Sequence, residues 1–98
     1  MKFVQTIEFR TTRYDEVSAL MDEWANATES PRPPPRVFTP RDRERADTYV
    51  QVVEFPSYED AMRNSQLPET SAFAEKMMAL CEGEPIFRNL DVVREEAL

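Results

Sequence analysis

The sequence predicts an α+β domain in which helices lie on one face of a four-stranded antiparallel sheet. Residues 2–10 and 47–55 carry the alternating, β-branched and aromatic residues that are typical of strands. Apolar residues repeat at helical spacing in residues 13–27 and 68–82. A chain of 98 residues forms one domain, residues 1–98. It buries only about 60–65% of its unfolded surface, so association with a second copy would stabilise it.

The strand at residues 47–55 has apolar side chains on both of its faces. Alternation divides them into two sets, Tyr49, Gln51, Val53 and Phe55 on one face and Val50 and Val52 on the other. A half-solvated antiparallel strand would have a polar outer face. Helices are therefore expected to cover one face, and either more helices or a second copy of the chain must cover the other.

In the N-terminal half we expect a strand at residues 2–10 and a helix at residues 13–27, with Thr12 as the N-cap. Residues 29–35 are rich in proline, which lacks the amide donor that a helix interior requires. They predict a stiff surface loop, and a PxxP ligand for a partner domain is the alternative. Residues 36–41 predict a second strand, which its proline restricts to a sheet edge or a strand end.

The C-terminal half contains a helix that is split in two. Ser57 followed by Asp60 is a capping-box variant, which predicts the start of a short helix at residues 57–66. Pro68 suits the first turn of the next helix, at residues 68–82. The chain's single glycine follows that helix, at a position where helices often end in a left-handed residue.

The remaining segments complete a recognisable order. Residues 42–46 predict a charged hairpin turn, residues 85–93 a last strand, and residues 94–98 a polar tail. The order is strand, helix, strand, strand, helix pair, strand, which is the ferredoxin-like βαββαβ arrangement with a split second helix. Helices can cover only one face of such a sheet. Since a large exposed apolar face normally marks a protein interface, we expect a homodimer with a two-fold interface.

The chain resembles the dimeric α/β-barrel superfamily, close to its small domains of the antibiotic-biosynthesis-monooxygenase type. The best-matching piece is Tyr49–Ala61 (YVQVVEFPSYEDA), a strand that leads into a capped helix. Leu67–Thr70 (LPET) and Phe87–Leu90 (FRNL) are also similar to small uncharacterised members, and the resemblance covers nearly the whole chain. It implies a homodimer whose two sheets close a barrel, with any ligand cavity between the sheet and helices of each protomer. It does not imply one reaction, because the fold hosts several.

Composition disfavours several classes of function. The net charge of −7 argues against binding to nucleic acid or to an anionic membrane surface. The apolar runs are too short to span a bilayer and the N-terminus lacks a signal-peptide pattern, so we expect a cytoplasmic protein. The sequence has no histidine, the commonest general base and metal ligand, and the haem-degrading relatives typically bind iron through one. We expect neither a metal nor a cofactor.

The resemblance also suggests candidate ligand-binding residues. Cofactor-independent oxygenases of that family place polar side chains around an aromatic substrate. The residues of matching type here are Trp24, Tyr49, Gln51, Asn64, Arg88 and Asn89. They do not align with that branch position by position, so no catalytic role carries over.

Each candidate also has a structural interpretation. Trp24 can fill the core, and Asn64 can bond a helix end. Arg88 can form an ion pair across strands with Glu8 or Glu54. The strand glutamine, if buried, needs a partner, which can be a backbone group, a dimer contact or a ligand. The single cysteine lies on a helix stripe and is expected to be a core residue.

Three functions remain open. The first is binding of a small apolar or aromatic molecule between sheet and helices. The second is a cofactor-independent monooxygenase-like or isomerase-like enzyme that acts on a phenolic substrate. The third is a structural or regulatory dimer with a filled core and no ligand. A cavity of roughly several hundred cubic ångströms beside Trp24 and Tyr49 would favour the first two functions. A solid core would favour the third.

Overall fold

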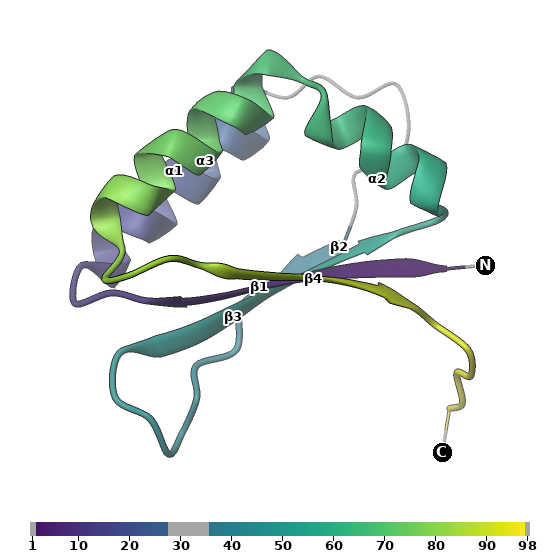
Figure 1. Cartoon of the computed structure of the whole chain (residues 1–98), viewed down its shortest axis with the longest axis horizontal. Helices are drawn as coiled ribbons and strands as arrows, with labels where there is room; N and C mark the ends of the chain where they lie inside the picture. The colour runs from purple at the N-terminus through teal and green to yellow at the C-terminus, as the bar shows by residue number, and fades with distance from the viewer. Residues whose placement is uncertain (1, 28–35, 98) are drawn as a thin grey trace.

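The computed structural model describes residues 2–27 and 36–97, which form a four-stranded sheet with three helices on one of its faces (Figure 1). In chain order the elements are β1 (Phe3–Arg10), α1 (Tyr14–Ala27), β2 (Arg36–Phe38), β3 (Thr48–Phe55), α2 (Tyr58–Ser65), α3 (Pro68–Leu80) and β4 (Ile86–Asp91). The strands lie in the order β2-β3-β1-β4, and every neighbouring pair is antiparallel. The predicted ferredoxin-like fold with a split second helix is confirmed. The proline-rich segment predicted to be a loop lies outside the described residues.

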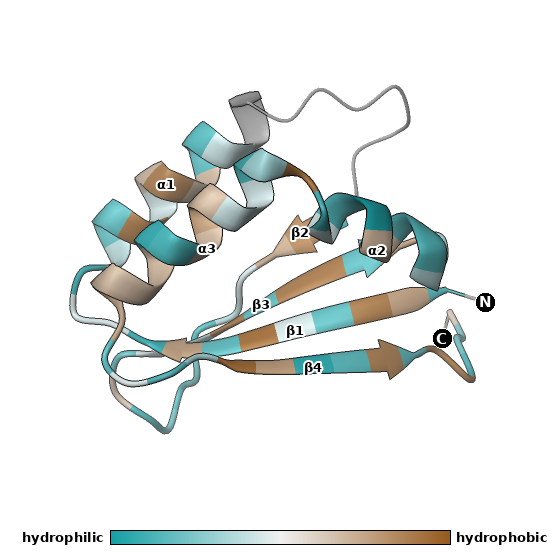
Figure 2. Ribbon diagram, turned by 45° about the horizontal axis from the view of Figure 1, so that its top comes forward, coloured by the Kyte–Doolittle hydropathy of each residue, from teal (hydrophilic) through white to brown (hydrophobic). Residues whose placement is uncertain are grey.

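The helices pack on the sheet face that carries Phe3, Ile7 and Phe9. The β1–β3 register places Phe3 opposite Phe55 and Ile7 opposite Gln51, so the predicted apolar faces of the two central strands coincide. Two core clusters result, Ile7, Phe9, Val17, Leu20 and Met77 beneath α1 and α3, and Phe3, Val53, Phe55 and Ala61 beneath α2. Figure 2 shows α2 as predominantly hydrophilic, consistent with a single fully buried side chain on that helix.

Thr11 joins three elements at one end of the sheet. Its side chain is almost fully buried, its Oγ1 donates to the Leu80 carbonyl oxygen at 2.7 Å, and it accepts from the Arg13 N–H at 2.9 Å. The Thr11 backbone N–H also donates to the Asp47 carbonyl at 2.9 Å. The hydroxyl at the start of α1 is therefore that of Thr11, whereas Thr12, the predicted N-cap, is exposed.

The capping box of α2 is confirmed. Ser57 Oγ accepts from the Asp60 backbone N–H at 3.2 Å and donates to the Asp60 carboxylate at 3.1 Å. Helix α3 begins at Pro68 as predicted, but it ends at Leu80 rather than at residue 82. The reason is tertiary, because the Glu82 N–H donates to the Arg10 carbonyl at 2.7 Å and draws the chain toward β1.

The strands are shorter than the sequence indicated. Strand β2 ends at Phe38, before the proline, and only a single bridge at Arg41 continues its pairing with β3. Strand β3 begins at Thr48, because Asp47 adopts a left-handed φ of 57° in the preceding turn. Strand β4 ends at Asp91, two residues before the predicted end.

No helix in the described part of the chain covers the opposite face of the sheet (Figure 1). The apolar residues that the strand registers place on that face are Val4, Phe38, Val50, Val52, Ile86 and Leu90. Three of them, Phe38, Ile86 and Leu90, are 42–45% exposed. The expectation that β3 is apolar on both faces is therefore confirmed, and the second face lacks a cover within the described chain.

Candidate ligand cavity

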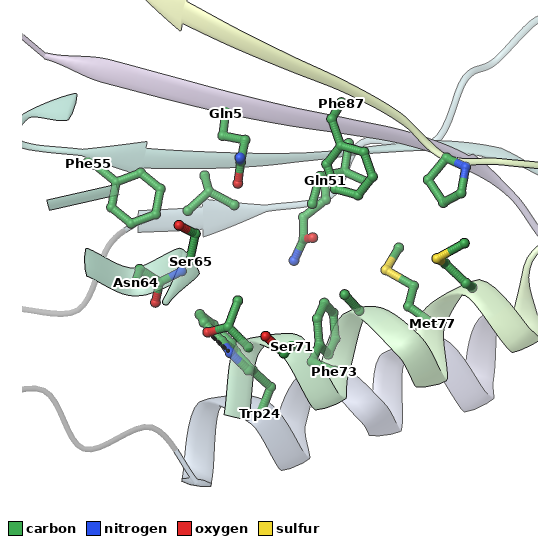
Figure 3. A pocket seen from close by; sticks show the side chains of 16 residues that line it. Gln5, Trp24, Gln51, Phe55, Asn64, Ser65, Ser71, Phe73, Met77 and Phe87 are labelled. Atoms are coloured by element: carbon green, nitrogen blue, oxygen red, sulfur yellow. Dashed lines mark hydrogen bonds between the residues drawn. The ribbon is translucent and has the colours of Figure 1, made fainter. Parts of the chain in front are cut away.

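A cavity of about 230 Å³ lies between the sheet and the helices (Figure 3). Strands β1, β3 and β4 line one side, and all three helices line the other. The residues that determine its chemistry are Gln5, Gln51 and Phe87 on the strands and Trp24, Asn64 and Phe73 on the helices. The cavity extends the helix-side core into a space that the core side chains leave unfilled.

The cavity is lined by apolar groups, amides and hydroxyls. None of the lining residues, all of which belong to the described chain, has an acidic, basic, thiol or phenol side chain. Proton transfer by a side chain normally requires one of these groups. The lining therefore suits an uncharged molecule, and it provides hydrogen bonds rather than acid–base chemistry.

Gln51 is the central polar group of the cavity. Its side chain is 4% exposed, and its amide points from β3 into the space beneath the helices (Figure 3). The amide makes no hydrogen bond to any described residue. In the described chain, every side-chain nitrogen or oxygen that is fully enclosed has a hydrogen-bond partner. The amide is therefore not fully enclosed but open to the cavity, where it can both donate and accept a hydrogen bond.

Gln5 is a second amide on the same side of the cavity, and it is not among the residues that the sequence predicted for the site. Its Nε2 donates to Asn89 Oδ1 at 3.3 Å, across the register pair that joins β1 to β4. Asn89 itself does not line the cavity, but its hydrogen bond orients Gln5, which does. The available signal was a polar residue that shares a strand face with Phe3, Ile7 and Phe9.

Trp24 closes the cavity on the side of α1. Its Nε1 donates to Thr70 Oγ1 at 3.2 Å, and its ring centroid lies 5.9 Å from that of Phe73. A second cavity, of about 190 Å³, lies between α1 and α3, and Trp24 and Phe73 line both spaces. These two rings therefore separate one cavity from the other.

Comparison with models of known protein families finds no match, and comparison with curated protein sequences finds none. Solved structures match over nearly the whole chain. A Caulobacter crescentus protein provisionally assigned as an antibiotic biosynthesis monooxygenase has a TM-score of 0.79 at 14% identity, over 95% of this chain and 91% of that one. SnoaB, a cofactor-independent oxygenase from Streptomyces nogalater, has a TM-score of 0.73 at 15% identity, over 96% and 95%. Rv0793 from Mycobacterium tuberculosis has a TM-score of 0.75 at 12% identity, over 99% and 100%.

The chain has the fold of the antibiotic biosynthesis monooxygenases. The resemblance inferred from residues 49–61 is therefore confirmed for the fold. At identities of 12–15% the likeness does not extend to a reaction or a substrate. Each candidate residue is therefore placed by its own contacts.

The structure brings Trp24, Gln51 and Asn64 to the cavity, and it places Tyr49 and Arg88 elsewhere. Tyr49 stacks between Phe9 and Tyr14, with centroid distances of 5.5 and 4.5 Å, because its position on β3 lies at the end near Thr11. Arg88 belongs to the uncovered face of the sheet. Its Nη1 lies 3.6 Å from Glu8 Oε1, which is the cross-strand pair that the sequence suggested.

The cysteine and the charged side chains of the described chain lie outside the cavity. Cys81 packs against the core cluster beneath α3, and burial raises the pKa of its thiol. A raised pKa keeps the group protonated and unreactive. Within the described ranges no group of three or more Asp, Glu, Cys or His side chains could hold a metal ion, and no helix has the length and apolar character to cross a bilayer.

Proposed function

We propose that the chain binds a small apolar or aromatic molecule in the cavity between the sheet and the helices. The observation that carries this proposal is the Gln51 amide, which is buried, has no hydrogen bond within the described chain and is open to the cavity. An apolar cavity with a few convergent polar groups is the usual form of a small-molecule site. The unfilled space argues against the alternative of a filled-core structural dimer.

A cavity-filling substitution tests this proposal. Ala74 lines the cavity from α3, so Ala74→Leu should fill part of the space and abolish binding. Ala79 is an exposed alanine on the same helix, and Ala79→Leu is the matched control. Binding of a panel of uncharged aromatic compounds is measured by calorimetry, with emission from Trp24, the chain's single tryptophan, as a second signal. If no compound binds the unsubstituted protein, the proposal fails.

A second candidate is a cofactor-independent oxygenase that acts on a phenolic substrate. The observation that favours it is the fold shared with SnoaB, which is itself a cofactor-independent oxygenase. Because the lining has no ionisable side chain, the substrate would have to enter in its neutral form and give its proton to water. An isomerase that needs a side-chain base is disfavoured on the same ground. Oxygen consumption with a panel of dihydroxy-aromatic compounds tests this candidate, and turnover no faster than in buffer counts against it.

We propose in addition that the chain acts as a homodimer in which the uncovered sheet faces pack together. The supporting observation is the group of partly exposed apolar side chains on that face, which includes Phe38, Ile86 and Leu90. Leu90→Lys places a charge in this interface and should produce a monomer in sedimentation experiments. Val93→Lys is the matched control, because Val93 is 87% exposed and lies beyond the end of β4. A monomeric unsubstituted protein at high concentration would contradict the proposal.

A further inference from the structure

We infer that the ligand of this cavity is an uncharged compound of one or two rings whose carbonyl or hydroxyl group bonds Gln51. The inference rests on the proposed binding function, because it describes the molecule that the cavity accepts. Three properties of the described residues support it, namely the charge of the lining, the size of the space and the position of the free amide.

The lining selects against charge. No acidic or basic side chain faces the space, so an ionised ligand would lose its hydration without gaining a counter-charge. The available polar partners are the amides of Gln5, Gln51 and Asn64 and a few hydroxyls. These groups bond neutral carbonyl and hydroxyl groups well, but they do not offset the desolvation of a full charge.

The volume limits the number of rings. An apolar cavity of roughly 150 Å³ holds one benzene molecule, and the cavity here is about 230 Å³. The added space corresponds to about one further ring. The rings of Trp24 and Phe73 prevent a larger ligand from extending into the second cavity. The hydrogen bond from Trp24 to Thr70 holds the tryptophan in place. Trp24 therefore limits the cavity on the side of α1.

The free amide fixes the position of the ligand's polar group. Gln5 already donates to Asn89. The side-chain amides of Gln51 and Asn64 have no hydrogen bond within the described chain, and Gln51, which is 4% exposed, is the buried one of the two. A ligand with a carbonyl or hydroxyl near β3 satisfies this amide. A purely apolar analogue leaves it unpaired, and sites built around a hydrogen bond discriminate against such analogues.

Calorimetric titration with four matched probes tests the inference. 1-Tetralone is a two-ring ketone, tetralin is the same skeleton without the carbonyl, tetrahydronaphthoate adds a carboxylate, and anthrone adds a third ring. We expect 1-tetralone to bind about tenfold more tightly than tetralin, the affinity typical of one neutral hydrogen bond. Anthrone and the carboxylate should bind at least about tenfold more weakly than 1-tetralone.

Two variants assign these differences to residues. In Gln51→Leu the preference for 1-tetralone over tetralin should disappear. If the leucine variant does not fold, the same measurement is made on Gln51→Met. In Trp24→Ala the two cavities should join, so anthrone should gain affinity relative to 1-tetralone.

The outcomes separate this inference from the proposed function. If none of the probes binds, tetralin included, the proposed function fails and the inference fails with it. If tetralin binds as tightly as 1-tetralone, or if the carboxylate or anthrone binds equally well, the cavity is a ligand site but the ligand class is wrong. A preference for 1-tetralone that persists in Gln51→Leu would also overturn the inference, because another residue would then bond the carbonyl.

Discussion

Replacing Gln51 with leucine should stabilise the ligand-free protein. The side chain is 4% exposed and its amide has no hydrogen bond to a described residue. Burial of an unpaired amide costs roughly 1–3 kcal/mol in protein mutational data. Because this amide is open to the cavity, water can bond it there and offset part of the cost. We therefore expect Gln51→Leu to raise the free energy of unfolding by about 1 kcal/mol.

Urea and thermal unfolding measure this change. For a domain of this size, about 1 kcal/mol corresponds to an increase in Tm of roughly 4–8 °C. The control is Gln66→Leu, at the exposed C-cap of α2, where the change should stay within about 0.5 kcal/mol. All variants are compared at one protein concentration, because the stability of a dimer depends on it.

A loss of stability would refute the reasoning. If Gln51→Leu lowered the free energy of unfolding by about 1 kcal/mol or more, the amide would be holding the structure together through a bond of its own. It would then not be a group left free for a ligand. A gain in stability together with a loss of affinity for ketone ligands is the pattern of a residue retained for function at the expense of stability.

Three further predictions concern residues outside the cavity. Thr11→Val should lower the free energy of unfolding by about 2 kcal/mol in urea, because it removes both bonds of a buried hydroxyl, whereas Thr11→Ser should retain most of the stability. Because burial raises the pKa of Cys81, its thiolate fraction at pH 8 should be below that of a free thiol. Iodoacetamide should therefore alkylate Cys81 more slowly than glutathione and faster as the pH rises, and equal rates at pH 8 would contradict this. Arg88→Met should leave ligand affinity within about twofold and change the free energy of unfolding by less than about 1 kcal/mol, because this half-exposed side chain pairs with Glu8 on the uncovered face. A larger loss of affinity in calorimetry would place Arg88 at the site.

The element order was predictable because its signals are local. Alternation in β1 and β3, the capping box at Ser57 and the proline at the start of α3 each depend on residues a few positions apart. The end of α3 was not predictable in this way. It depends on the Glu82 N–H meeting the Arg10 carbonyl, a contact between distant parts of the chain.

The site was predictable in part, for the same reason. Trp24, Gln51 and Asn64 stood out as polar or aromatic residues on elements with an apolar face, and all three line the cavity. Gln5 meets the same criterion, because it is a polar residue on the apolar face of β1, and it also lines the cavity. Tyr49 satisfied the rule as well, but its position along β3 places it in an aromatic stack instead.

The sequence alone determined which side chains share a face of each strand, because side-chain direction in a strand follows from parity. Which of the two faces the helices cover is a result of the tertiary structure. Only the tertiary structure decided which of those side chains find a partner. Gln5 and Gln51 are the same residue type on the same face of the sheet, yet the register gives Gln5 an asparagine across the strand and leaves Gln51 facing an unfilled space. Hydrogen bonding and packing are satisfied between elements, so a difference of this kind exists only after the sheet and helices have assembled.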